Sequence, residues 1–295
     1  KRLELNGLSF HYLEKGHEDP AKPLMIFLHG FPYFASAWKP LLVPLSDQYH
    51  VVALDNRGYA YSTKPEDVND YHIRHLVNDV KALIDTLNNN KGSSQKTILV
   101  GHDWGGVVAW TVAQQYPELI AQVIVINAPP FNTFLRTLST SPAQQEASKY
   151  VPWLSSWLSR LAFFVKGPEL LWGKSLVSLH ENGHIDDAFK AEFLAAWGQE
   201  NAASSATKWY QANIPEFDDI SAQHYWPEAA KKITVPSLLI WSKDDKAFTQ
   251  DMFEAIIADV EQVKVNVIDT SSHAPFLDHT DQVLKYIREF LLENK

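Results

Sequence analysis

Residues 97–116 read TILVGHDWGGVVAWTVAQQY, and this stretch decides the fold. Its first four residues are apolar or β-branched, which predicts a buried strand over 97–101, and residues 105–116 predict a helix. The turn between them is Gly101-His102-Asp103-Trp104-Gly105. Two glycines around one reactive residue, between a strand and a helix, predict the sharp turn called a nucleophile elbow. We therefore expect Asp103 to be a nucleophile; the alternative is a residue that only caps the following helix.

The alternation of strands and helices continues outward from this turn. Apolar runs alternating with amphipathic segments predict an α/β fold, with a mostly parallel central sheet flanked by helices. Residues 131–226 break the rhythm, because they are rich in Trp, Ser and Ala and show helical patterns without a clear strand. We predict a core of residues 1–130 and 227–295, and a helical cap of residues 131–226 over the carboxyl ends of the strands. Further strands are expected at 8–13, 23–28, 50–54, 123–127, 235–241 and 263–268, and helices at 71–87, 249–259 and 278–292.

The presence of Asp at the elbow, where ester hydrolases carry Ser, points to different chemistry. A carboxylate is a poor nucleophile toward an acyl carbonyl, but it can displace a leaving group at saturated carbon and form an alkyl–enzyme ester. Water must then hydrolyse that ester, and this step needs a base. The sequence therefore favours a reaction with two steps, and an ordinary esterase is disfavoured.

The base and its partner are expected after later strands, in the order acid and then histidine. His273 follows the strand expected at 263–268, and Asp245 follows the strand expected at 235–241. Asp245 would hold the imidazole in one tautomer and stabilise its cationic form. Asp244 is the rival for this role, and either residue could instead be a solvated turn residue.

Composition excludes several other classes. The formal net charge is −9 and no basic run occurs, so nucleic acid and anionic membranes are not expected partners. Cysteine is absent, and no close His/carboxylate ligand pattern occurs, so we expect neither a metal nor another cofactor. The lack of cysteine fits the cytoplasm. The chain begins at Lys1 rather than Met, so a signal peptide that has been removed stays an alternative to a cytoplasmic location.

Five motifs together make the chain resemble the α/β-hydrolase-fold epoxide hydrolases and their relatives, the haloalkane dehalogenases. They are HGFP at 29–32, DNRGY at 55–59, GHDWGG at 101–106, WSKDD at 241–245 and SH at 272–273. The resemblance implies that the backbone N–H groups of Phe31 and Trp104 form an oxyanion hole, which strengthens catalysis at the transition state. It also implies a cis peptide bond before Pro32.

Two tyrosines in the expected cap extend the resemblance. Epoxide hydrolases use a pair of cap tyrosines to donate protons to the leaving oxygen, and Tyr suits this role because it is neutral at pH 7. Tyr150 lies in QEASKYVPW (145–153), and Tyr210 lies in WYQAN (209–213), where Gln211 replaces the more usual Arg. The resemblance implies that both are catalytic; the alternative for each is a packed aromatic with a satisfied hydroxyl.

The resemblance favours hydrolysis of an epoxide to a vicinal diol, by a monomer or homodimer that needs only a small apolar epoxide and water. Haloalkane dehalogenases usually have Asn where this chain has Phe31, and fluoroacetate dehalogenases have Arg where it has Trp104. A dehalogenase is therefore the second hypothesis, and a non-catalytic binding protein on the same fold is the third. Pro32 and Trp153 are expected in the substrate pocket. The aromatic residues of the cap either line an apolar pocket or hold its helices together: Trp153, Trp157, Phe163, Phe164 and Trp172.

Overall fold

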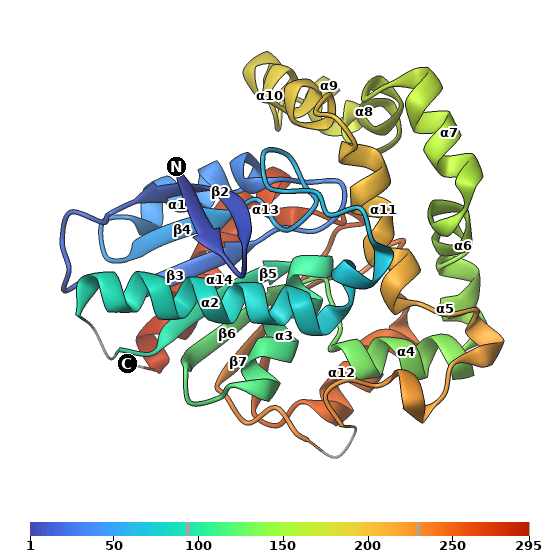
Figure 1. Ribbon diagram of the computed structural model, residues 1–295. Helices are drawn as coiled ribbons and strands as arrows, with labels where there is room; N and C mark the ends of the chain where they lie inside the picture. The colour runs from blue at the N-terminus through green and yellow to red at the C-terminus, as the bar shows by residue number, and fades with distance from the viewer. Residues whose placement is uncertain (93–94, 229–230, 295) are drawn as a thin grey trace.

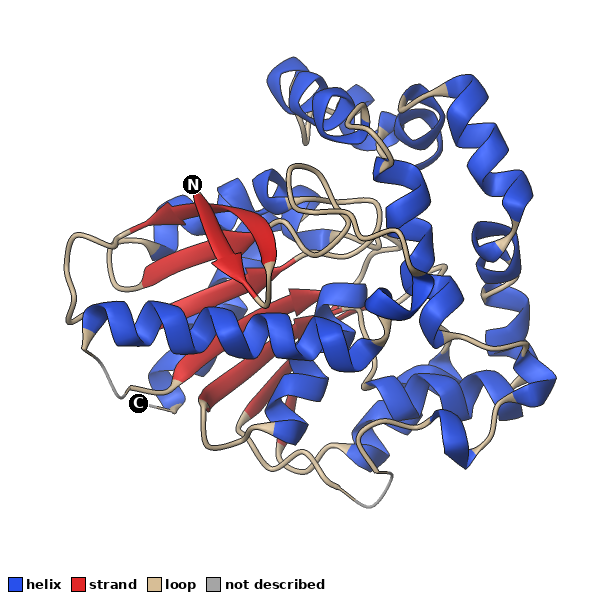
Figure 2. Cartoon of the chain, in the orientation of Figure 1, coloured by secondary structure: helices blue, strands red, loops and turns tan. Residues whose placement is uncertain are grey.

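The computed structural model describes residues 1–92, 95–228 and 231–294, and it contains one twisted sheet crossed by helices (Figures 1 and 2). Within these residues eight strands pair in the order β1-β2-β4-β3-β5-β6-β7-β8. The first two strands run antiparallel to their neighbours, and the others are parallel. The strands are β1 Arg2–Leu5, β2 Leu8–Lys15, β3 Leu24–Leu28, β4 His50–Leu54, β5 Thr97–His102, β6 Ile120–Ile126, β7 Ser237–Ser242 and β8 Val263–Ile268.

The central strands are buried on both faces because helices cover the sheet on each side. Every residue of β3, β4, β5 and β7 is buried, as expected for parallel strands that read as continuous apolar runs. In Figure 1 α2 and α3 lie in front of the sheet, and α1 and α14 lie behind it. The predicted α/β fold with a mostly parallel sheet is confirmed.

The helices of the core and those between β6 and β7 differ in length and arrangement. None of the helices in the described residues has the length and apolar character that a membrane crossing requires. The core helices are α1 Lys39–Leu45, α2 Ile73–Lys91, α3 Trp104–Gln115, α12 Gln250–Asp259, α13 Pro275–Asp278 and α14 Thr280–Glu293, with 3-10 turns η1 Ala35–Trp38 and η2 Val68–Tyr71. Between β6 and β7 lie α4 Phe131–Thr140, α5 Pro142–Ala147, α6 Tyr150–Ser155, α7 Trp157–Lys166, α8 Glu169–Ser175, α9 Val177–Glu181, α10 Asp187–Trp197 and α11 Ala202–Asn213, then η3 Phe217–Asp219 and η4 Ala222–His224.

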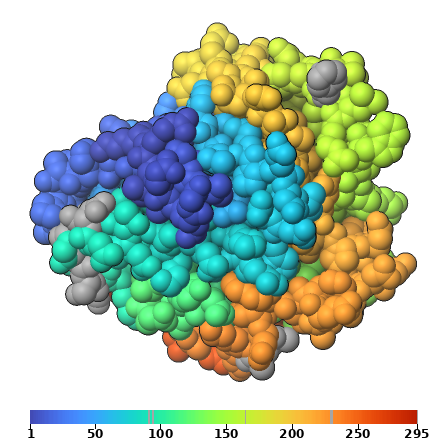
Figure 3. All heavy atoms as spheres, in the orientation of Figure 1, coloured from blue at the N-terminus to red at the C-terminus, as the bar shows by residue number. Residues whose placement is uncertain are grey.

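The helical segment between β6 and β7 corresponds in position to the predicted cap. Its first helix, α4, packs against α3 and α12 of the core, and the helices that follow extend past the carboxyl ends of the strands (Figure 1). Figure 3 shows the gold atoms of this segment lying against the light-blue atoms near residue 70. Two indole N–H groups fasten it to the core: Trp197 Nε1 donates to the Pro32 carbonyl at 2.8 Å, and Trp209 Nε1 donates to the Arg57 carbonyl at 2.9 Å.

The side chain of Arg57 makes a second set of contacts, and its ion pair with Asp79 is buried. Its Nε and one terminal nitrogen each donate to a carboxylate oxygen of Asp79 at 2.7 Å. The other terminal nitrogen donates to the Asp70 carbonyl at 2.8 Å, and Asn6 also donates to Asp79. The guanidinium therefore ties the loop after β4 to α2. The backbone carbonyl of the same residue, Arg57, accepts the hydrogen bond from Trp209.

We predict that Arg57→Met lowers the free energy of unfolding by about 3–5 kcal/mol, because Asp79 would be left as an unpaired buried carboxylate. Urea unfolding followed by circular dichroism measures the change. The double variant Arg57→Met/Asp79→Leu should recover most of the loss, since both charges are then gone. A loss below about 1 kcal/mol in the single variant would contradict a structural role for the pair.

Candidate active site

The elbow predicted at residues 101–105 is present between β5 and α3. Asp103 adopts φ 51° and ψ −128°, a backbone conformation that residues with a side chain rarely take. Close packing around it requires glycine. A Cβ on Gly105 would lie 2.1 Å from the carbonyl oxygen of Leu28, and one on Gly101 would lie 2.5 Å from the carbonyl oxygen of Gly105. The turn therefore places the Asp103 side chain beyond the carboxyl end of β5.

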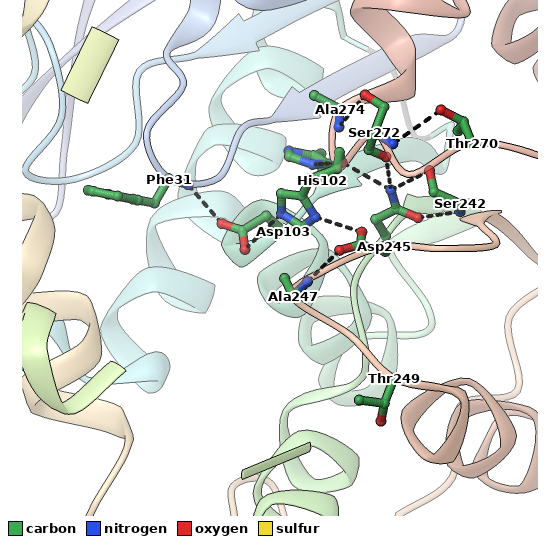
Figure 4. A network of polar contacts seen from close by, with 12 residues as sticks. Phe31, His102, Asp103, Ser242, Asp245, Ala247, Thr249, Thr270, Ser272 and Ala274 are labelled. Atoms are coloured by element: carbon green, nitrogen blue, oxygen red, sulfur yellow. Dashed lines mark hydrogen bonds and ion pairs between the residues drawn. The ribbon is translucent and has the colours of Figure 1, made fainter. Parts of the chain in front are cut away.

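Backbone amides hold one side of the Asp103 carboxylate. The N–H of Phe31 donates to Asp103 Oδ1 at 2.7 Å (Figure 4). The backbone N–H of Trp104 also helps to lower the pKa of the Asp103 carboxyl group. The Phe31–Pro32 peptide bond is cis. Of the two N–H groups expected to form an oxyanion hole, that of Phe31 thus already binds this carboxylate.

On the other side the carboxylate faces His273. Asp103 Oδ2 lies 3.6 Å from His273 Nε2, and His273 Nδ1 lies 2.7 Å from Asp245 Oδ2. The second oxygen of Asp245 accepts the N–H of Ala247 at 2.7 Å. Asp244 is exposed and contributes only its backbone N–H, to the Thr270 carbonyl. Geometry therefore selects Asp245 over Asp244 as the partner of the histidine (Figure 4).

The two carboxylates determine the charge of the histidine. Burial lowers the pKa of His273, but the negative charges of Asp245 and Asp103 outweigh burial and raise it to about 10. Burial raises the pKa of Asp103, but the bond and charge of His273 outweigh it, so the net shift is downward. At neutral pH the resting site therefore holds two carboxylates and one imidazolium.

The backbone of His273 is held by two residues at the carboxyl ends of neighbouring strands: His102 ends β5, and Asn127 follows β6. The side-chain N–H of Asn127 donates to the His273 carbonyl at 3.0 Å and to Ser242 Oγ at 2.9 Å, and Asn127 Oδ1 accepts the N–H of Ser242. His102 Nε2 donates to the same carbonyl at 2.7 Å, and burial lowers the pKa of His102 to about 3, so it is neutral. Asn127 was not predicted as a residue of the site, although a polar residue after a buried strand was a usable signal.

The two expected tyrosines line the same cavity as Asp103. Tyr150 begins α6 and Tyr210 lies in α11; their ring centroids are 6.3 Å apart. The ring of Tyr210 also packs edge-on against Phe31 and Trp104, at 5.9 and 5.4 Å. Burial and the charge of Asp103 raise the pKa of both tyrosines, so both hydroxyls stay protonated at neutral pH.

These groups share one cavity of about 440 Å³, lined from both the core and the cap. Lys174 and Lys246 were not predicted from the sequence, because isolated lysines outside a motif carry no signal. The described residues that line the cavity are Phe31, Pro32, Tyr33, Asp103, Tyr150, Lys174, Ser175, Tyr210, Lys246, Ala247, Ser271 and His273.

Most of the aromatic residues expected near the pocket lie elsewhere. Trp153 is not part of the described cavity lining; it is 38% exposed and its ring packs edge-on against Phe163. Trp157 is 63% exposed, whereas Trp172 is buried against Phe193. The side chain of Phe164 lies outside the described residues. For Phe163 and Trp172 the structure agrees with the alternative that they hold the cap together.

No group of three or more His, Asp or Glu side chains in the described part of the chain is arranged to hold a metal ion. The polar side chains of the described cavity lining are a carboxylate, an imidazolium, three phenols, two serine hydroxyls and two ammonium groups. This set can supply a nucleophile, a base and proton donors from protein side chains alone.

Residues 23–280 match the family described as alpha/beta hydrolase fold. The chain is 32% identical over 300 residues to the Homo sapiens protein named Epoxide hydrolase 4. The alignment covers 99% of this chain and 78% of that protein. It is 30% identical to Epoxide hydrolase 1 of Caenorhabditis elegans, covering 98% of this chain and 69% of that protein. A crystal structure of Bacillus megaterium epoxide hydrolase with an inhibitor aligns with a TM-score of 0.88 at 29% identity, covering 99% of both chains.

The fold and the site thus define an α/β hydrolase with a carboxylate at its elbow. Within that class, the chain belongs to the epoxide hydrolase family, whose members are hydrolases acting on ether bonds.

We predict that Asp103→Asn lowers the pKa of His273 from about 10 by about 1–3, because one of its two neighbouring charges is lost. NMR titration of the histidine ring measures this, with His273→Gln assigning the resonance. Asp269→Asn is the matched control, since Asp269 is an exposed carboxylate paired with Lys243. An unchanged His273 titration in Asp103→Asn would show that Asp245 alone sets its charge.

Proposed function

We propose that this chain hydrolyses an epoxide to a vicinal diol through a covalent ester on Asp103. The observation that carries the proposal is that Asp103 faces Tyr150 and Tyr210 across one cavity. A carboxylate can open the epoxide ring, and two protonated phenols can bind the leaving oxygen. The structure of a Bacillus megaterium epoxide hydrolase mutant complexed with its product, a naphthyloxy-propane-1,2-diol, supports this class of reaction.

In the first step Asp103 Oδ2 attacks one ring carbon and the epoxide C–O bond breaks. Oδ2 is the nucleophilic atom because Oδ1 is already bound by the Phe31 amide. One tyrosine gives its proton to the departing alkoxide. The imidazolium of His273 then supplies a replacement proton through solvent, which leaves an alkyl ester, neutral imidazole and two intact phenols.

In the second step His273 removes a proton from water, and the hydroxide attacks the carbonyl carbon of the ester. Asp103 no longer carries a charge at this stage, so the pKa of His273 falls and the imidazole can act as a base. The oxyanion forms on Oδ1, between the amides of Phe31 and Trp104. Cleavage of the ester C–O bond releases the diol as the new carboxyl group gives its proton to the leaving alkoxide, which restores carboxylate and imidazolium.

We predict that Tyr150→Phe/Tyr210→Phe lowers kcat for styrene oxide by about 10²–10⁴-fold, because the alkoxide loses its proton donors. Diol formation measured by chromatography gives the rate. Tyr286→Phe is the matched control, since Tyr286 lies on α14 away from the cavity. Diol formation that survives in the double variant would remove the tyrosines from the mechanism. Halide release from haloalkanes without epoxide turnover would instead establish a dehalogenase.

We predict that a single turnover in ¹⁸O water places the heavy oxygen on Asp103 and leaves the diol unlabelled. Water attacks the ester carbonyl, so the oxygen added to substrate comes from the carboxylate. Mass spectrometry of the peptide and of the diol measures both. In His273→Gln the ester should accumulate as a mass increase equal to the substrate. Label in the diol after one turnover would mean direct attack by water and no ester.

A further inference from the structure

Two lysines line the cavity that contains Asp103. Lys174 is in α8 of the cap segment, and Lys246 is in the core loop after β7, next to Ala247. Both side chains are exposed. Within the described residues neither forms a hydrogen bond, an ion pair or a ring contact. The described cavity lining therefore includes one ammonium group from the cap segment and one from the core, with no described protein anion bound to either.

This arrangement differs from that of most described lysines. Lys39 pairs with Glu192, Lys264 pairs with Glu293, and Lys190 lies over the ring of Trp172. Exposed lysines are normally solvated and contribute little to binding. Two lysines that share a cavity wall and lack partners are different, because a single ligand can contact both.

The charge balance of the cavity leaves these two cations uncompensated. Asp103 is the one carboxylate among the described lining residues, and it is matched by the imidazolium of His273. Asp245 is buried behind that histidine, and Asp244, although exposed near Lys246, does not line the described cavity. The apolar part of the wall, from Phe31 and Pro32 on the core side, is left to hold hydrocarbon.

We propose that Lys174 and Lys246 form a subsite for an anionic group, so that the preferred substrate is an epoxide bearing a carboxylate away from its ring. The inference rests on the function proposed above and adds the substrate class. The epoxide would lie between Asp103 and the tyrosines, and the carboxylate would face the two ammonium groups. Lysine suits this role as a compact charge on a flexible stem that can reach anions at different distances.

Styrene oxide and its para-carboxylate form a matched substrate pair that differs by one charge. Lys174→Gln/Lys246→Gln should lower kcat/KM for the carboxylate about 5–20-fold, mainly through KM, because two exposed ion pairs are lost. Turnover of styrene oxide should change less than about twofold. The effect should shrink as salt rises from about 50 to about 500 mM, because salt screens exposed charges. Lys232→Gln/Lys285→Gln, which removes two lysines outside the cavity lining, should change neither substrate.

Equal effects of the lysine variant on both substrates, or no effect on either, would overturn the subsite while leaving epoxide hydrolysis intact. Failure of the wild type to turn over either epoxide would instead overturn the proposed function. In that case calorimetric binding of the para-carboxylate diol and of its neutral counterpart still tests the subsite. If the lysine variant binds the anionic diol more weakly but the neutral diol equally well, the subsite is supported. Equal affinities of wild type and variant for the anionic diol refute the subsite.

Discussion

The backbone of Asp103 is the constraint on which the site depends. It is held at φ 51° and ψ −128°, which costs about 1–3 kcal/mol for a residue with a side chain. Its surroundings stabilise this conformation through contacts that only glycine permits. A Cβ on Gly30 would lie 2.1 Å from Asp103 Oδ1, and a Cβ on Gly105 would lie equally close to the Leu28 carbonyl. Because two backbones approach so closely, the Phe31 amide reaches the carboxylate directly. The strained turn and the oxyanion site are therefore one structural feature.

Electrostatics links this turn to the base. His273 lies between Asp103 and Asp245, and the two negative charges keep the imidazole protonated in the resting site. Only one of these charges is permanent, because an ester on Asp103 would remove the other. In the mechanism we propose, the same geometry would then favour the neutral imidazole when the ester must be hydrolysed. Asn127 and His102 bind the His273 carbonyl, so the ring can change its charge while its backbone stays fixed.

The sequence predicted those parts of the molecule that depend on local pattern. Buried parallel strands appear as apolar runs, and Asp103 follows such a run directly. His273 lies in the loop that follows the half-buried strand β8. The edge strand β1 was missed because it is short and alternates with charged residues, and α1 was missed because it contains Pro40 and Pro44. The placement of Trp153 outside the cavity could not be read, because α6 has only six residues and its orientation comes from distant contacts. Lys174 reaches the cavity for the same reason, through the packing of the cap.

The cap contacts also explain the motif around Arg57, a residue that does not belong to the described lining of the cavity. The Arg57 carbonyl binds the indole of Trp209, the residue just before Tyr210. One residue further along α11, Gln211 donates to the carbonyl at the end of α6, the helix that begins with Tyr150. The Arg57 loop therefore helps to position Tyr210 through Trp209, and α11 helps to position Tyr150 through Gln211. Gln211 can replace the more usual Arg because an amide suffices for a bond to a carbonyl. The motif thus supports the positions of both cavity tyrosines.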